Sequence, residues 1–270
     1  MRRKANCPGE TTEGLDFNRT AALGAGTQEE VIMIPQQETR WESKIPDLHP
    51  QWQGVDLAEI LALPTAYLAI GYANSTLSES GAQSHERLWE RGRRPVANTV
   101  KMVHVCRDAG MRLFWTEYKI FRQHYPQTPL DKSQYDFWAS GFADWTDERK
   151  EQDWQPIPEI AELMRPEDPV IYYPALGNVF LGTMLPANLN MFGIRTVLLS
   201  GFHLDWCIEQ AARTCRDMGY MPIVIGDACG CGREEDEAPT LERLDRFFAP
   251  VVSTDTAIDL VQQAVQMRGT

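Results

Sequence analysis

The sequence predicts an α/β fold, a single-domain, Rossmann-like three-layer α/β/α sandwich built on a six-stranded parallel sheet. Short apolar runs alternate along the chain with stretches whose apolar residues recur at helical spacing, the pattern typical of parallel sheets covered by helices. Gly or Pro residues bound most of these stretches. The chain has 270 residues, 43% of them hydrophobic, which is enough for the core of one large α/β domain.

The apolar runs predict the strands, and the stretches between them predict the helices. We expect strands near residues 66–71, 111–117, 170–173, 196–201, 221–226 and 249–252. Helical spacing indicates helices over residues 95–109, 158–164, 182–192, 207–218, 234–248 and 254–267. Gly110, Gly193 and Gly219 follow three of these helices, as left-handed stop residues do.

The chain divides into an N-terminal extension, residues 1–55, and an α/β domain, residues 56–270. The extension is polar and is expected to be partly disordered. Its two β-like runs, residues 31–34 and 39–43, fit either a hairpin or a segment laid over a neighbouring subunit. Residues 120–155 are rich in aromatic residues, and they fit either a lid over a pocket or an interface loop.

Composition and charge exclude several function classes. The net charge of −12 argues against nucleic-acid binding, and no run of 18 apolar residues predicts a membrane span. The 6 cysteines show no disulfide framework, so we expect a reducing, cytoplasmic location. No spacing of His, Cys, Asp or Glu predicts a metal site, and no cofactor is expected. The expected partners are a small-molecule substrate and further copies of the chain in a homo-oligomer.

The stretch from Thr196 to Cys231 carries the strongest functional signal. A predicted strand ends at Ser200-Gly201, a polar turn follows, and Cys207 falls in the first turn of the next helix if Asp205 is its N-cap. A helix N-terminus favours a thiolate over a thiol. The carboxyl end of a parallel strand is also where open α/β sheets bind ligands. The alternative reading of Cys207 is a small, buried, apolar residue.

Ser200-Gly201, Asp205, Cys207 and Asp227-Ala228 together resemble the nucleophile segment of the isochorismatase-like cysteine hydrolases. This superfamily includes isochorismatases, nicotinamidases, N-carbamoylsarcosine amidohydrolases and ureide-type amidases. The resemblance covers roughly residues 64–261. It implies that Cys207 is a nucleophile and that backbone N–H groups of the turn hold an oxyanion. It also implies a cis peptide bond that shapes the oxyanion hole, which we expect between His203 and Leu204.

The chain departs from the family pattern at two catalytic positions. The family's first strand ends in an Asp that acts as general base, within an Asp-x-Gln-Asn pattern, and this chain has Gly71 at the Asp position and keeps Asn74. The family's Lys position falls on Tyr173 or Pro174, and Asn178 lies where the family often has Ser or Asn. If these losses limit the reaction, Gly71→Asp together with Tyr173→Lys is expected to raise turnover.

Other side chains are candidates to replace the missing groups. Glu117, at the end of the second predicted strand, and His203, in the nucleophile turn, are candidate bases. Tyr172 and Tyr173 are candidate hydrogen-bond donors at the place of the Lys ammonium group. Together with Gly71, Asn74, Asn178 and Leu204, these tyrosines form the expected substrate-binding set.

Two functions are therefore open at the level of the sequence. The first is a divergent cysteine hydrolase acting on an amide, ureide, ester or related bond of a small molecule. The second is a non-hydrolytic relative that binds a ligand, assists a non-covalent rearrangement or acts as a scaffold. A Cys207 more reactive than the other cysteines favours the first, and a Cys207 that can be replaced without loss favours the second.

Overall fold

The computed structural model describes residues 45–83, 88–117, 128–130, 132–133, 144–173 and 177–269. These belong to a compact unit that spans Arg40–Thr270. The β-like runs at residues 31–43 and most of the aromatic-rich stretch at residues 120–155 lie outside the described residues.

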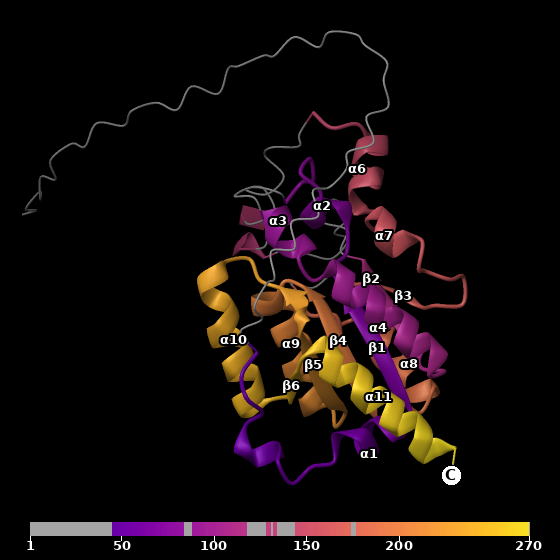
Figure 1. Ribbon diagram of the computed structural model, residues 1–270. Helices are drawn as coiled ribbons and strands as arrows, with labels where there is room; N and C mark the ends of the chain where they lie inside the picture. The colour runs from indigo at the N-terminus through magenta and orange to yellow at the C-terminus, as the bar shows by residue number, and fades with distance from the viewer. Residues whose placement is uncertain are drawn as a thin grey trace, which may run out of the picture. The chain divides into compact units, whose positions relative to one another are not determined.

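One parallel sheet forms the middle layer of this unit (Figure 1). Its strand order is β3-β2-β1-β4-β5-β6, and every neighbouring pair is parallel. The strands are β1 (Thr65–Ile70), β2 (Arg112–Glu117), β3 (Val170–Tyr172), β4 (Thr196–Phe202), β5 (Met221–Gly230) and β6 (Val251–Val252). The predicted fold class is thus confirmed.

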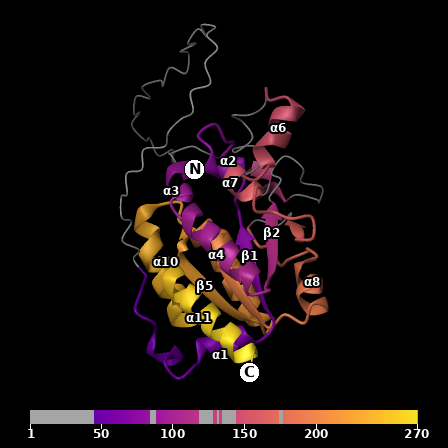
Figure 2. The same cartoon turned by 45° about the vertical axis from the view of Figure 1, so that its right-hand side comes forward.

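Helices cover both faces of the sheet, because alternate side chains of each buried strand point to opposite faces. In β1, Leu68 and Ile70 join the core on one face, whereas Tyr67 and Ala69 join the core on the other. The Leu68 face packs against α8 (Leu185–Met191), α9 (Glu209–Asp217) and α10 (Glu234–Phe247). The Tyr67 face packs against α1 (Leu57–Ala62), α4 (Val96–Asp108) and α11 (Thr254–Arg268), and Figure 2 shows α4 and α11 running across it.

The remaining helical segments are short. They are η1 (Pro50–Trp52), α2 (Asn74–Leu77), α3 (Leu88–Arg93), α6 (Asp147–Trp154), α7 (Pro158–Ala161) and a π-helical turn, η5 (Leu204–Ile208). Helical periodicity did not predict α1, α2, α3 or α6, because one or two turns are too short to show a repeating apolar face.

The compact unit begins before residue 56, where the sequence placed the domain boundary. The side chain of Trp52 is buried, and its Nε1–H donates to the carbonyl oxygen of Asp245 at 2.7 Å. The backbone N–H of His49 donates to a carboxylate oxygen of the same Asp245 at 2.7 Å. Residues 45–55 are thereby attached to the C-terminal part of α10.

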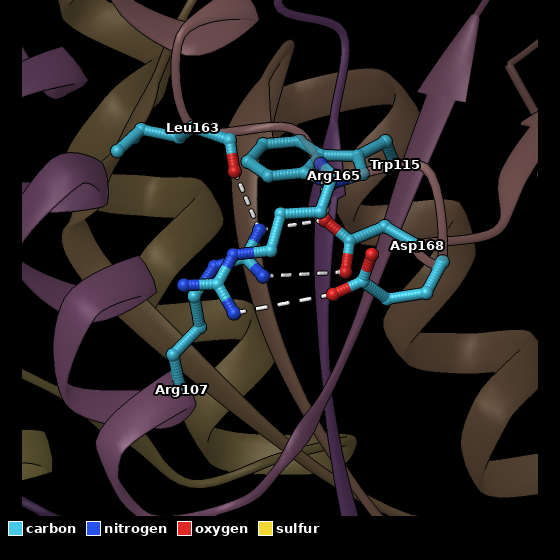
Figure 3. A network of polar contacts seen from close by, with 6 residues as sticks. Arg107, Trp115, Leu163, Arg165 and Asp168 are labelled. Carbon is cyan, nitrogen blue, oxygen red and sulfur yellow. Dashed lines mark hydrogen bonds and ion pairs between the residues drawn. The ribbon is translucent and has the colours of Figure 1, made fainter.

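A buried ion pair fixes the start of β3 (Figure 3). Oδ2 of Asp168 accepts hydrogen bonds from Nη2 of Arg107 at 2.6 Å, from Nε1 of Trp115 at 3.0 Å and from the backbone N–H of Arg165 at 3.0 Å. The second guanidinium bond of Arg107 goes to Oδ1 of Asp168 at 3.5 Å. Helix α4 and strand β2 are thus connected to the loop before β3, the strand that leads to Tyr172 and Tyr173.

Candidate active site

The nucleophile turn follows β4 at the carboxyl edge of the sheet. Strand β4 ends at Phe202, the turn η5 covers Leu204–Ile208, and α9 continues from Glu209. The N-cap position of the turn is His203, so the expectation that Asp205 caps the helix is wrong. The strand is one residue longer than predicted and the turn begins earlier, which places Asp205 inside the turn. There its Oδ1 accepts from the backbone N–H of Gly232 at 3.4 Å.

The non-proline cis peptide bond lies between Phe202 and His203. The sequence placed it between His203 and Leu204, one residue too late. Phe202 still pairs with Gly230 in the sheet, so the chain leaves the strand at the peptide bond that directly follows Phe202.

A narrow cavity opens beside this turn, at the carboxyl ends of β1, β2 and β4. Its volume of about 20 Å³ is room for roughly one water molecule, so a larger ligand requires the walls to move apart. The described residues that line it are Gly71, Ala73, Ser75, Thr76, Gln83, Thr116, Tyr173, Gly177, Phe202, His203, Trp206 and Cys207. Four predicted site residues are therefore brought together: Gly71, Tyr173, His203 and Cys207.

Cys207 is buried in this cavity wall, and its Sγ lies 3.8 Å from the hydroxyl oxygen of Tyr173. Burial raises the pKa of the Cys207 thiol to about 11, although hydrogen bonds with Tyr173 and the backbone of His203 lower it. The charge of Asp205 raises it further. Burial is the largest of these effects and favours the thiol form of Cys207, whereas the sequence alone favoured a thiolate.

Cys207 still has the lowest pKa among the described cysteines. Burial raises the pKa of Cys106 and of Cys231 to about 12. It also raises the pKa of Cys215 and of Cys229. The order of reactivity expected from the sequence therefore keeps a physical basis, which is the hydrogen bonding of Cys207 with Tyr173 and the backbone of His203.

Gly71 leaves no space for a side chain. Its φ is +78°, and a Cβ atom built there would lie 2.0 Å from the carbonyl oxygen of Phe202. Its backbone N–H donates to Oγ1 of Thr116 at 3.2 Å. The general base of the family pattern is thus absent, and this backbone cannot accept it by a simple substitution. In this backbone, Gly71→Asp together with Tyr173→Lys is therefore a poor test of whether the missing groups limit the reaction.

Glu117 and Tyr172 do not line the Cys207 cavity. Side chains alternate between the two faces of β2, so Glu117 lies on the same face as Trp115 and opposite to Thr116. Trp115 belongs to the core on the face of the sheet that does not hold Cys207. Glu117 lines a neighbouring cavity with Trp154. The side chain of Tyr172 is 55% exposed at the end of β3.

The other predicted substrate-binding residues are Asn74, Asn178 and Leu204, which lie in or next to the loops around the cavity. Nδ2 of Asn74 donates to the carbonyl oxygens of Gln152 and Gln155, at 3.2 and 3.1 Å. Asn178 accepts at Oδ1 from the backbone N–H groups of residues 180 and 181, at 3.0 and 3.3 Å, and donates to Thr214 at 3.0 Å. Leu204 is completely buried in the core. Pro174, the alternative Lys position, lies outside the described residues.

Sequence reasoning missed four polar residues of the cavity: Ser75, Thr76, Gln83 and Thr116. Thr116 could have been found, since it precedes the last residue of β2 and faces the side of the sheet that holds Cys207. No sequence signal points to the other three: Ser75 and Thr76 lie on α2, and Gln83 lies in the loop after it, which is hydrogen-bonded to α2 and α6.

Neither a metal centre nor a membrane span is found in the described part of the chain. No three His, Cys, Asp or Glu side chains there lie close enough to hold an ion. No helix among the described residues has both the length and the apolar character to cross a bilayer.

Comparison with known proteins finds relatives in sequence and in fold. Nicotinamidase 3 of Arabidopsis thaliana is 27% identical over 165 residues, which cover 60% of this chain and 77% of the relative. A cysteine hydrolase from Pseudomonas syringae pv. phaseolicola 1448A superposes with a TM-score of 0.64 at 17% identity, covering 75% of this chain and 94% of that one. N-carbamoylsarcosine amidase from Thermoplasma acidophilum does so with a TM-score of 0.54 at 21% identity, covering 72% and 98%.

The two superpositions support the fold alone, because their sequence identities are low. The model of the isochorismatase domain matches residues 65–256, which include every strand of the sheet. The chain therefore belongs to the isochorismatase family.

Proposed function

We propose that this protein is a divergent cysteine hydrolase that acts on the C–N or a related acyl bond of a small molecule, with Cys207 as nucleophile. The supporting observation is the position of the thiol in a cavity at the carboxyl edge of the parallel sheet. Tyr173 lies on one side of it, and His203 heads the same turn. The substrate class follows from the family and from relatives named as a nicotinamidase and an N-carbamoylsarcosine amidase.

The first chemical step must remove the proton of Cys207. With a pKa of about 11, roughly one thiol in ten thousand is ionised at pH 7. His203 is the candidate acceptor, because it is the one described histidine that lines the cavity. The Tyr173 hydroxyl group, 3.8 Å from Sγ, is the candidate donor that stabilises the sulfur anion in place of an ammonium group.

The thiolate then attacks the carbonyl carbon of the substrate. The C–N bond breaks, the departing amine takes the proton held by His203, and an acyl thioester remains on Cys207. Water, deprotonated by the same imidazole, hydrolyses the thioester and releases the acid. The resemblance to the family implies that backbone N–H groups of this turn hold the oxyanion of the intermediate.

Two observations favour the second candidate, a non-hydrolytic ligand-binding relative. Gly71 excludes a carboxylate at the position of the usual base, and burial raises the pKa of the Cys207 thiol to about 11. In such a protein the same cavity would bind a small molecule without forming a thioester.

Hydrolysis of nicotinamide, N-carbamoylsarcosine, simple ureides and isochorismate separates the two candidates. The hydrolase proposal predicts turnover of at least one substrate, and a loss of roughly a thousandfold or more in Cys207→Ala. Tyr173→Phe and His203→Gln should each lose about tenfold to a thousandfold in kcat. Cys106→Ala, which removes a buried thiol far from the cavity, is the matched control. Binding without turnover, unchanged by Cys207→Ala, would identify the non-hydrolytic relative.

The homo-oligomer and the cytoplasmic location stay predictions. The first can be tested by light scattering of the purified full-length chain, and the second by fractionation of the source cells.

A further inference from the structure

The described wall of the Cys207 cavity combines apolar residues with several uncharged polar ones. Hydroxyl groups of Ser75, Thr76 and Thr116 line it together with the amide side chain of Gln83. The described lining residues include no Arg, Lys, Asp or Glu. No fixed positive charge within this described lining is therefore available to a substrate carboxylate.

Gln83 carries an unused hydrogen-bond donor in this wall. The residue is 8% exposed, and within the described part of the chain no acceptor lies in reach of its buried Nε2. A buried donor without a partner destabilises a protein, and such groups are rare. An acceptor on a bound molecule would satisfy it.

The position of Gln83 is fixed by its backbone. Its N–H donates to the carbonyl oxygen of Ser75 at 2.7 Å, and the N–H of the preceding Ala82 donates to Oδ1 of Asp153 at 2.9 Å. Hydrogen bonds to α2 and α6 therefore anchor the backbone at residues 82 and 83. The residue lines the cavity from this anchored backbone, as a recognition group should.

We propose that Gln83 determines substrate specificity by donating a hydrogen bond to a neutral carbonyl oxygen, and that the site accepts small uncharged amides or ureides and rejects carboxylates. This inference rests on the proposed function in that Cys207 is the reacting group. An anion would lose hydration on entering this narrow cavity, where the charge of Asp205 already acts on Cys207 and the described wall has no Arg or Lys to offset the loss. A neutral amide loses less hydration and gains the Gln83 donor.

Iodoacetamide and iodoacetate test this proposal without requiring turnover. Iodoacetamide carries a neutral amide where iodoacetate carries a carboxylate. With either reagent the Cys207 thiolate forms an S–C bond to the CH₂ carbon, and the C–I bond breaks with loss of iodide. Labelling rates at Cys207 are measured by peptide mapping at pH 8, where the imidazole of free histidine is neutral. Each rate is divided by the rate of the same reagent with glutathione.

The wild-type protein should prefer iodoacetamide by about tenfold or more over the ratio found for glutathione. Gln83→Leu, similar in size, should reduce the iodoacetamide rate about threefold to tenfold, because one hydrogen bond is lost. Gln262→Leu, an exposed glutamine on α11, should change neither rate. Equal normalised rates in the wild type, unchanged rates in Gln83→Leu, or no labelling by either reagent would overturn the proposal.

A second measurement uses the wild type alone and does not depend on the folding of a variant. Nicotinamide should protect Cys207 from iodoacetamide, and nicotinate, its carboxylate counterpart, should not. Equal protection by both would overturn the proposed selectivity. Because neither experiment needs hydrolysis, a protein that shows this selectivity without turnover would refute only the hydrolase proposal.

Discussion

Replacement of Gly71 by Ala should destabilise the protein far more than the same replacement at a glycine of similar backbone conformation. Gly71 has a φ of +78°, and Gly110, between α4 and β2, has a φ of +69°. A left-handed conformation costs an L-residue about 1–2 kcal/mol, so both variants should lose this amount. Only Gly71 has a neighbour in the way.

The added cost at Gly71 comes from backbone, not from a side chain that can turn aside. A new Cβ would lie 2.0 Å from the carbonyl oxygen of Phe202, whereas at Gly110 nothing lies within 4 Å. Phe202 is held by its pairing with Gly230 in the sheet. Relief of the clash requires β1 and β4 to shift, and overpacking of this kind costs about 1–3 kcal/mol. The sum predicts a loss of roughly 2–5 kcal/mol for Gly71→Ala.

Urea unfolding followed by tryptophan fluorescence measures the free energy of unfolding of both variants. We expect Gly71→Ala to be less stable than Gly110→Ala by about 1–3 kcal/mol. Equal losses would refute the argument that the Phe202 carbonyl group excludes a side chain at this position. In that case Gly71→Asp would again be a reasonable way to restore a general base.

Three further predictions concern other parts of the chain. Burial raises the pKa of Asp153 from 3.8 to about 6, so its contribution to the free energy of unfolding is complete below pH 4 and is lost as the pH rises through 6. Asp153→Asn should remove this loss, at most about 3 kcal/mol, from unfolding curves measured between pH 4 and 7.5. An unchanged dependence of stability on pH in the variant would contradict the prediction. Arg107→Ala leaves the buried Asp168 without its cation and should lower the free energy of unfolding in urea by about 3–5 kcal/mol. The control Arg165→Ala removes an exposed arginine and should lower it by less than about 1 kcal/mol. Similar losses in the two variants would show that the Arg107–Asp168 ion pair is not important for stability. Iodoacetamide should label Cys207 faster than Cys215, whose pKa is raised further, and faster labelling of Cys215 would be the opposite result.

The sheet could be predicted because the chain signals its buried strands directly. A strand buried on both faces, such as β1 or β4, appears as an uninterrupted apolar run, and all six runs became neighbouring parallel strands. The short helices gave no such signal. Helix α6 lies in the aromatic-rich stretch and is strongly polar apart from Trp154, so it shows no apolar face. Its main sequence signal is Thr146, which caps its N-terminus.

The candidate site was predictable where it depends on chain order, and unpredictable where it depends on side-chain direction. The turn after β4 carries Cys207, and the strand ends beside it carry Gly71 and Tyr173, as parallel topology requires. Glu117 failed because the alternation along β2 points it to the opposite face. Gln83 reaches the cavity through the packing of its loop against α6, which no local pattern encodes.

The pKa of Cys207 shows a different limit of the sequence. A position near a helix N-terminus can be inferred from spacing, and it argues for a thiolate. Burial depends on the complete fold, and it raises the pKa of the thiol, the opposite direction to that expected at a helix N-terminus. Spacing in the sequence therefore points to the candidate residue, but its protonation depends on how the fold buries it.

The loss of the family's carboxylate at Gly71 is coupled to a second close approach in the same place. A Cβ at Gly201 would lie 1.9 Å from the carbonyl oxygen of Ile70, just as one at Gly71 would lie 2.0 Å from that of Phe202. The backbones at the ends of β1 and β4 are thus too close together for a Cβ atom at either glycine. A side chain at Gly71 or at Gly201 would require the other strand to move. The proposed hydrolase would then need a general base from a different element, and the candidate is His203, which lines the cavity on the turn that also carries Cys207.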